Sequence, residues 1–253
     1  MSRLITRRSA LIGLAAGANG LLAGCDSLGR EGPVRKLIFK GDDWNRRLQR
    51  LVTDRTALAR EFAPEDRSPV FRANGTRNPD TPSYNAHAAN DFADWRIRVD
   101  GLVATPLDIP VAQFRAMPAR SQITRHDCVE GWSAIGKWTG PQLAMILKAA
   151  GLRDRANYIV FHCADRLRGT PYYESIDLVD AFHPQTILAW AMNDEPLTVP
   201  HGAPVRLRVE RQLGYKHAKF VHRIEAVHSL TPIGRGQGGY WEDVADYDWY
   251  AGI

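Results

Sequence analysis

The sequence predicts an α+β domain that is rich in β-sheet, with short helices and long loops. Apolar and charged residues alternate at 95–99 and 205–209, and an apolar run occupies 157–163, as is typical of strands. Only 142–150 has clear helix boundaries, with Gly151 as the stop signal. Short strands mixed with scattered helices, without any repeat, favour this fold class.

Composition excludes several classes of protein. Of the 253 residues, 44% are hydrophobic and 24% charged, which excludes a disordered or collagen-like chain. Three cysteines cannot form a disulfide-rich scaffold. The net charge of +5 includes Arg3, Arg7 and Arg8 of the leader, and the remaining 30 basic residues face 28 acidic ones. We therefore expect no nucleic-acid partner.

The N-terminus has the pattern of an export signal. Arg7 and Arg8 precede an apolar stretch of about 16 residues, whereas about 20 are needed to span a bilayer. This pattern predicts a cleaved twin-arginine signal over 1–24 and a periplasmic protein. Leu22-Ala23-Gly24-Cys25 resembles a bacterial lipobox, so we expect a lipid anchor at Cys25, with cleavage without lipid as the alternative.

The mature chain is expected to begin with a tether over 25–41, followed by one domain over 42–253. Trp44, Leu48 and Leu51 fall at helical spacing after Asp42, and a further turn or two is expected through Leu58 and Phe62. Residues 63–94 are rich in Pro and Gly and predict a long irregular segment, of the kind that is usually functional or disordered.

Two further features are local. Thr139 and Gln142 have the spacing of a capping box for the helix over 142–150. Aromatic residues gather at 240–241 and 249–250 near the C-terminus, and we expect a docked tail there, with a lid as the alternative.

Cys128 is the residue best suited to a chemical role. It follows Arg125 and His126 in Arg125-His126-Asp127-Cys128, and positive neighbours favour a thiolate. Three interpretations are open from the residues alone. Cys128 could be a catalytic nucleophile, a partner of Cys163 in a disulfide, or a ligand of a soft or redox-active metal.

Three separate motifs give a resemblance to a known family. They are Cys128-Val129-Glu130-Gly131-Trp132-Ser133, Gly202-Ala203-Pro204-Val205-Arg206-Leu207 and Gly214-Tyr215-Lys216-His217-Ala218-Lys219. In this order and spacing they resemble the molybdopterin-binding domain of the sulfite oxidase family, over roughly residues 80–230. The likeness is greatest to the exported bacterial branch that includes the catalytic subunit of periplasmic methionine-sulfoxide reductase.

The resemblance implies roles for particular residues. Cys128 would bind molybdenum through its thiolate, and Glu130 could carry protons near the metal. Lys216 would join Lys219 near the pterin phosphate. The full set of implied cofactor contacts is Asn85, His87, Cys163, His201, Arg206, His217, Ala218 and Lys219. Cys163 stands where the family has Thr, His201 where it has Asn, and Glu210 where it often has Pro.

The implied function is oxygen-atom transfer by one molybdenum bound to one pterin. A sulfite-like anion or a sulfoxide is the expected substrate class. No Cys-x-x-Cys-His haem motif occurs, so electrons would be exchanged with a separate partner, either a membrane haem protein or a soluble cytochrome. The alternative is a non-catalytic exported lipoprotein that acts as a binding module, with Cys128 and Cys163 joined in a disulfide.

Overall fold

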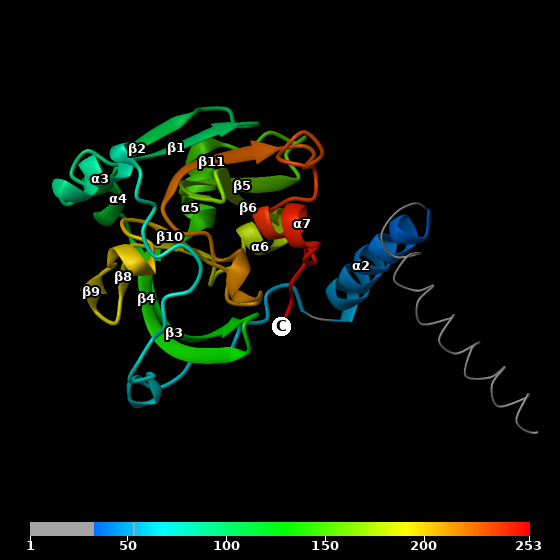
Figure 1. Ribbon diagram of the computed structural model, residues 1–253, viewed down its shortest axis with the longest axis horizontal. Helices are drawn as coiled ribbons and strands as arrows, with labels where there is room; N and C mark the ends of the chain where they lie inside the picture. The colour runs from blue at the N-terminus through cyan, green and yellow to red at the C-terminus, as the bar shows by residue number, and fades with distance from the viewer. Residues whose placement is uncertain (1–32, 53) are drawn as a thin grey trace, which may run out of the picture. The chain divides into compact units, whose positions relative to one another are not determined.

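The computed structural model describes residues 33–52 and 54–253, which belong to two separate units divided after Val52 (Figure 1). The first contains helix α2 (Pro33–Val52). The helix expected from Asp42 is confirmed, but it begins earlier, at Pro33, because proline is tolerated in a first helical turn. The predicted signal over 1–24 and the predicted lipid site at Cys25 lie outside the described residues.

The second unit is built on a five-stranded sheet in the order β2-β1-β11-β5-β6. The two strands β1 and β11 are parallel, and the other neighbours are antiparallel. The bounds are β1 (Arg96–Gly101), β2 (Leu107–Pro110), β5 (Tyr158–Leu167), β6 (Thr170–Asp177) and β11 (Val221–Val227). The strands predicted near 95–99 and 157–163 are thereby confirmed.

A second, four-stranded sheet has the order β3-β4-β8-β9, and β10 pairs with β7 in a two-stranded sheet. The long β3–β4 hairpin lies below the five-stranded sheet in Figure 1. The bounds are β3 (Ala119–Cys128), β4 (Trp132–Pro141), β7 (Ile187–Ala189), β8 (Ala191–Met192), β9 (Glu195–Pro196) and β10 (Arg206–Arg208).

The helices of this unit are short. They are α3 (Pro82–Ala89), α4 (Val111–Arg115), α5 (Leu143–Ala150), α6 (Leu178–Ala181) and α7 (Tyr240–Ala245), with 3-10 turns η1 (Pro64–Asp66), η2 (Val199–His201) and η3 (Gly214–Lys216). A sheet-rich mixed domain with short helices is therefore confirmed.

The core follows the alternation seen in the sequence. Ile97 and Val99 of β1 are completely buried, whereas Arg96 and Arg98 between them are exposed. Trp138 of β4 is also completely buried, at the centre of the same hydrophobic core. The pattern predicts this core because successive side chains of a strand point to opposite faces.

Some local predictions are wrong, each because a tertiary contact prevails. No helix passes through Phe62, because its N–H donates to the carbonyl of Ile123 at 2.9 Å as the segment runs beside β3. Helix α5 ends at Gly151 as expected, with φ of +68°. Its capping box does not form, since the Gln142 amide donates instead to the carbonyl of Pro184 at 2.7 Å.

Helix α3 was missed within the segment expected to be irregular. Thr81 caps it by accepting the Tyr84 N–H at 3.2 Å, and Pro82 occupies the first turn. The helix has only eight residues, of which only Tyr84 is buried, so no apolar stripe revealed it in the sequence.

A buried ion cluster fastens the C-terminal helix to the five-stranded sheet. The Lys216 ammonium donates to Glu174 of β6 and to Glu242 of α7 at 2.5 and 2.6 Å, and all three side chains are at most 1% exposed. Burial alone would lower the pKa of Lys216, but the two carboxylates raise it. Burial, followed by the charge of Glu242, raises the pKa of Glu174 well above its usual range.

This cluster predicts a pH-dependent difference between wild type and Glu174→Gln. With a raised folded-state pKa, Glu174 keeps a proton that the unfolded chain releases as the pH rises above 4.5. The free energy of unfolding of the wild type should therefore fall relative to that of the variant between pH 5 and 8. Urea unfolding at both pH values tests this, with Glu195→Gln on the exposed β9 as control. Parallel pH profiles for wild type and Glu174→Gln would contradict the shift.

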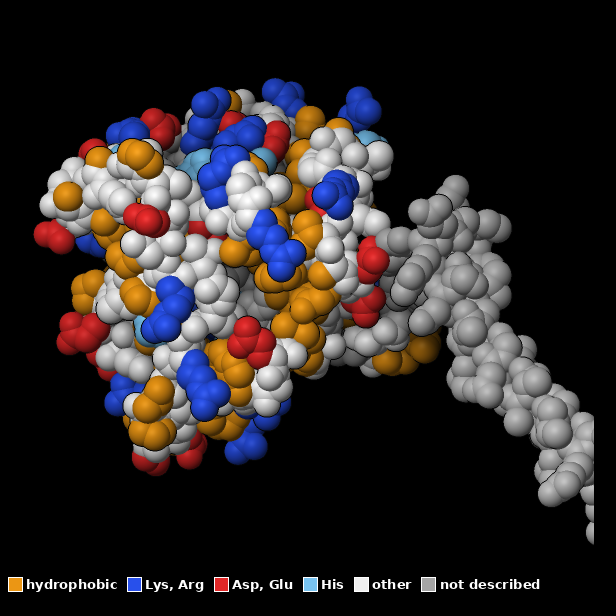
Figure 2. Space-filling view, in the orientation of Figure 1, with side chains coloured by type: hydrophobic (Ala, Val, Ile, Leu, Met, Phe, Trp, Pro, Cys, Tyr) orange, Lys and Arg blue, Asp and Glu red, His pale blue; other side chains and the backbone are white. Residues whose placement is uncertain are grey.

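Charged side chains are spread over the surface. Lys and Arg are interspersed with Asp and Glu on the face shown in Figure 2 and do not form one continuous patch. Several are paired, as in Arg96 with Asp108 and Arg223 with Asp100. The expectation of no nucleic-acid partner stays a prediction.

Candidate functional site

Cys128 lies at the end of a tight hairpin. The register pairs Cys128 with Trp132, so only Val129, Glu130 and Gly131 form the turn between β3 and β4. Gly131 has a φ of +83°, a left-handed conformation that favours glycine, and its N–H donates to the Cys128 carbonyl at 3.0 Å. The hairpin thus holds the thiol and the Glu130 carboxylate at one edge of a cavity of about 130 Å³.

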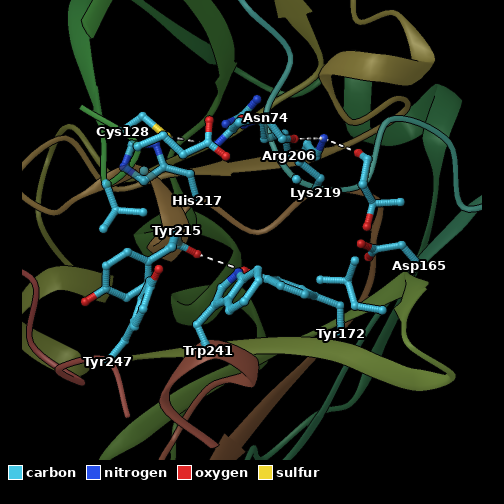
Figure 3. A pocket seen from close by; sticks show the side chains of 16 residues that line it. Asn74, Cys128, Asp165, Tyr172, Arg206, Tyr215, His217, Lys219, Trp241 and Tyr247 are labelled. Carbon is cyan, nitrogen blue, oxygen red and sulfur yellow. Dashed lines mark hydrogen bonds between the residues drawn. The ribbon is translucent and has the colours of Figure 1, made fainter. Parts of the chain in front are cut away.

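Cations line the same cavity. Arg206 comes from β10 and Lys219 from the segment before β11, and both are buried (Figure 3). Burial and the neighbouring Arg208 lower the pKa of Arg206 to about 9. The Lys219 ammonium donates to the carbonyls of Asn74 and Pro200 at 2.7 and 3.1 Å, and also to that of Thr76. Burial, followed by the charge of Arg206, lowers the pKa of Lys219 to about 7. A bound anion would favour the charged forms of both side chains, so the pair forms a site for an anion.

Three aromatic side chains face these polar groups across the cavity in Figure 3. Trp241 of α7 stacks on Tyr247 with ring centroids 5.6 Å apart, and Tyr247 meets the edge of Tyr215 at 5.0 Å. The Tyr215 hydroxyl donates to the Asp248 carbonyl at 2.6 Å. The expectation of a docked tail is confirmed, and the tail also forms one wall of the cavity.

Several buried polar atoms of the lining have no protein partner among the described residues. These atoms include Asn74 Oδ1, Arg206 Nε and His217 Nδ1. The other ring nitrogen of His217 donates to the carbonyls of Val209 and Gln212, and burial followed by Arg208 lowers the pKa of His217 well below its usual range. Nδ1 of the neutral ring is thus a free acceptor. Unpartnered donors and acceptors beside two cations fit a polar, anionic cofactor such as molybdopterin.

The Cys128 thiol is suited to a metal that can displace its proton. Burial raises the pKa of Cys128, an effect opposed by the Glu130 backbone N–H and by the charge of Arg206. Metal binding removes the proton from such a thiol. Among the described residues no group of three or more His, Cys, Asp or Glu side chains is placed to hold a metal ion. The role of Cys128 as a metal ligand stays a prediction.

The structure brings together five of the residues predicted for the site. Cys128, Glu130, Arg206, His217 and Lys219 all line the cavity. The carboxylate of Glu130 accepts a hydrogen bond from the Trp132 indole at 3.0 Å. A proton-carrying role for Glu130 stays a prediction.

Other predicted contacts lie elsewhere. The Asn85 amide donates to Asp80 at 3.1 Å on the exposed side of α3, and His87 Nδ1 is 2.7 Å from Asp94. His201 Nε2 bonds the Phe71 carbonyl at 3.1 Å. Ala218 is buried and its carbonyl accepts the Leu207 N–H at 2.8 Å. None of these residues lines the cavity with Cys128.

Cys163 and Lys216 are also away from this cavity. Cys163 is a buried free thiol on β5, as Cys128 is on β3, so the disulfide of the alternative interpretation is not formed. The side chain of Lys216 is occupied by the ion cluster with Glu174 and Glu242. Within its motif, Lys219 faces the cavity and Lys216 supports the wall.

Sequence reasoning missed several lining residues. Asn74 belongs to the Pro- and Gly-rich segment expected to be functional or disordered, and its Nδ2 lies 3.9 Å from the Cys128 sulfur. Asp165 lines the far side, and burial raises its pKa to about 6. The composition of the segment was the signal for the region of Asn74, and the aromatic pair at 240–241 was expected as a docked tail or a lid, whereas no local signal identified Asp165 or Tyr247.

The chain matches the model of a known protein family. The model described as the oxidoreductase molybdopterin binding domain matches residues 84–232. The chain belongs to this family. The molybdopterin-binding domain therefore includes Cys128, Arg206 and Lys219, whereas Asn74 and the aromatic wall from α7 lie outside the matched residues.

Curated relatives of the molybdopterin-binding domain come from several bacteria. The putative protein-methionine-sulfoxide reductase subunit YedZ1 of Azospira oryzae is 36% identical over 76% of this chain and 70% of its own length. The protein-methionine-sulfoxide reductase catalytic subunit MsrP of Gluconobacter oxydans is 31% identical over 71% of this chain and 59% of its own. The crystal structure of the sulfane dehydrogenase SoxCD from Paracoccus pantotrophus matches with a TM-score of 0.49 and 21% identity, over 54% of this chain and 39% of that chain.

Proposed function

We propose that this protein is a molybdenum enzyme of the periplasm that reduces the sulfoxide of oxidised methionine to the thioether. The observation that carries the proposal is the position of Cys128, which faces two buried cations and an aromatic wall across one small cavity. The names of the methionine-sulfoxide reductase relatives support the substrate.

In the proposed assignment, the Cys128 thiolate would hold the molybdenum of the cofactor. When bound, this group would supply the two-electron redox chemistry that oxygen-atom transfer requires. Arg206 and Lys219 bind the anionic part of the cofactor, and the unpartnered His217 Nδ1 accepts one of its donors. The chain thereby orients the cofactor and keeps its charge balanced.

The aromatic wall favours a neutral sulfur substrate over an oxyanion. Trp241, Tyr247 and Tyr215 offer ring faces and edges, and sulfur makes favourable contacts with aromatic rings. Overall, a sulfoxide, two electrons and two protons yield a thioether and water. We propose that a separate redox partner supplies the electrons, and that the twin-arginine signal over 1–24 and lipidation of Cys25 place the enzyme in the periplasm.

The test uses protein matured through its own export signal. We expect about one molybdenum per chain, and reduction of methionine sulfoxide with a reduced viologen dye as electron donor. Sulfite with an electron acceptor is the comparison, because the residues alone left sulfite-like anions open. Loaded protein that oxidises sulfite and leaves sulfoxides unchanged would refute the substrate. Natively matured protein without molybdenum would refute the enzyme.

Arg206→Met should lower cofactor occupancy by about tenfold or more, because it removes a charged hydrogen-bonding partner. The methionine keeps part of the packing against Trp138, whose ring centre lies 5.2 Å from the guanidinium carbon. Molybdenum and pterin per purified chain measure the effect, with the exposed Arg155→Met as control. Full occupancy combined with lost activity would instead move Arg206 to substrate binding.

Trp241→Ala should raise the KM for methionine sulfoxide by about tenfold, because it removes an aromatic contact to the substrate. The change in kcat should be smaller, since Trp241 does not touch the Cys128 end of the cavity in Figure 3. Steady-state kinetics at constant molybdenum content provide the measurement, with Phe182→Ala, an exposed ring outside the cavity, as control. An unchanged KM would exclude the wall from substrate recognition.

A further inference from the structure

Helix α2 carries a row of large apolar side chains that are exposed in the described part of the chain. Trp44, Leu48 and Leu51 are 72%, 59% and 82% exposed. Their spacing of four and three residues places them on one side of a helix. Exposed large apolar side chains in such a row are typical of a surface that binds another phase or molecule.

The rest of the helix is strongly basic. Its twenty residues contain six Lys and Arg and two Asp, a formal charge of +4. Helical periodicity places Arg46 and Arg50 on the side away from Trp44 and Leu48, whereas Arg47, three residues after Trp44, borders the apolar stripe. The helix thus combines an apolar stripe with a cationic face, which is the pattern of helices that lie in a lipid interface.

The helix is not suited to cross a bilayer. Among residues 33–52 and 54–253 no helix is long and apolar enough to do so. Twenty residues of α-helix measure about 30 Å, but those of α2 include six Lys and Arg and two Asp. A membrane would therefore be contacted along the length of the helix.

We infer that α2 lies flat on a bilayer that contains anionic phospholipid, with Trp44, Leu48 and Leu51 inserted and its Lys and Arg side chains at the headgroups. We choose an anionic bilayer over another protein because anionic headgroups complement the +4 charge of α2, whereas an apolar protein groove would not require that charge. The inference goes beyond the proposed function and does not depend on it. Helix α2 begins eight residues after Cys25, so it would give the protein a second membrane attachment beside the predicted lipid. A second attachment matters because a single acyl chain holds a protein at a membrane only reversibly.

The experiment uses the chain from Asp26 to Ile253, which keeps every described residue and removes both the leader and the lipid site. Sedimentation with vesicles compares phosphatidylglycerol mixed with phosphatidylcholine against phosphatidylcholine alone. We expect binding to the anionic vesicles, weaker binding at 0.5 M salt, and at least about tenfold weaker binding without phosphatidylglycerol. Equal binding to both vesicle types would overturn the inference.

Matched variants separate the helix from the rest of the chain. The double variant Leu48→Glu/Leu51→Glu should weaken binding by more than about tenfold. The control is Leu58→Glu/Val70→Glu, whose parent side chains are 55% and 70% exposed in the other unit. Arg47→Gln/Arg50→Gln should weaken binding by about tenfold, against Arg155→Gln/Arg168→Gln as control.

Vesicle binding by the Leu48→Glu/Leu51→Glu variant that is as strong as binding by the parent would overturn the inference. If the same variant also converts a dimer to a monomer on gel filtration, the apolar face packs against protein instead of lipid. Thermal unfolding of the 54–253 unit verifies that each variant is folded, and the lipid and salt dependence of the parent chain tests the inference without any substitution.

Discussion

Replacing Cys128 with serine should leave the fold intact and lower sulfoxide turnover by at least about a hundredfold. The side chain ends a hairpin that is held by ten registered residue pairs, so the loss of its sulfur should not disturb the strands. A serine hydroxyl does not ionise readily and is a poor ligand for a soft redox metal. Turnover per molybdenum and the unfolding temperature are the two measurements.

Cys163→Ala is the matched control for this prediction, because it removes the other buried free thiol of the described chain and does not line the cavity. It should retain activity within a few-fold of wild type. The alternative binding module makes the opposite prediction, since loss of either member of a disulfide would cost about 3–4 kcal/mol. Equal destabilisation by the two substitutions would support that alternative, and near-normal turnover by Cys128→Ser would refute the ligand role.

Lys216→Met should destabilise the protein by about 3–5 kcal/mol, because it leaves two buried acidic side chains without the cation that they share. Glu174 and Glu242 have no access to water that could replace the ammonium, since both are at most 1% exposed. The same change should loosen α7, and with it the wall that contains Trp241. Urea unfolding measures the first effect, and the KM for methionine sulfoxide the second.

Adding Glu242→Gln to Lys216→Met should recover part of the lost stability, because only one buried acidic side chain then lacks the cation. Lys219→Met is a useful comparison at the other lysine of the motif. Its ammonium bonds backbone carbonyls around the cavity, so its loss should affect cofactor content more than the attachment of α7. A Lys216→Met protein that unfolds at the wild-type denaturant concentration would contradict a structural role for the cluster.

Local sequence patterns predicted the main strands and helix α5 well, because the strands carry their own periodicity and α5 its own stop signal. Ile97 and Val99 could be placed in the core from alternation alone. The motif around Cys128 also identified Arg206, His217 and Lys219, because their order along the chain gave the family resemblance.

The remaining parts of the site depend on contacts between distant segments. Asn74 meets Cys128 across 54 positions of sequence, and Lys216 meets Glu174 across 42. Neither contact leaves a periodic pattern in the sequence. The motifs alone therefore led us to expect Asn85 as a polar contact of the cofactor and Lys216 as a ligand of the pterin phosphate. Arg206 and Arg208 alternate with apolar residues like a solvated face, yet both are buried, Arg208 by pairing with Glu210.

If the protein acts on oxidised methionine as proposed, the buried attachment of α7 has a consequence for which oxidised proteins could be repaired. Because a charged cluster inside the protein holds this side of the cavity, widening the entrance would require breaking that cluster. A damaged methionine would have to reach inward by its own mobility. We therefore expect oxidised side chains on unfolded tails and loose loops of client proteins to be restored first, and those within folded interiors only after local opening.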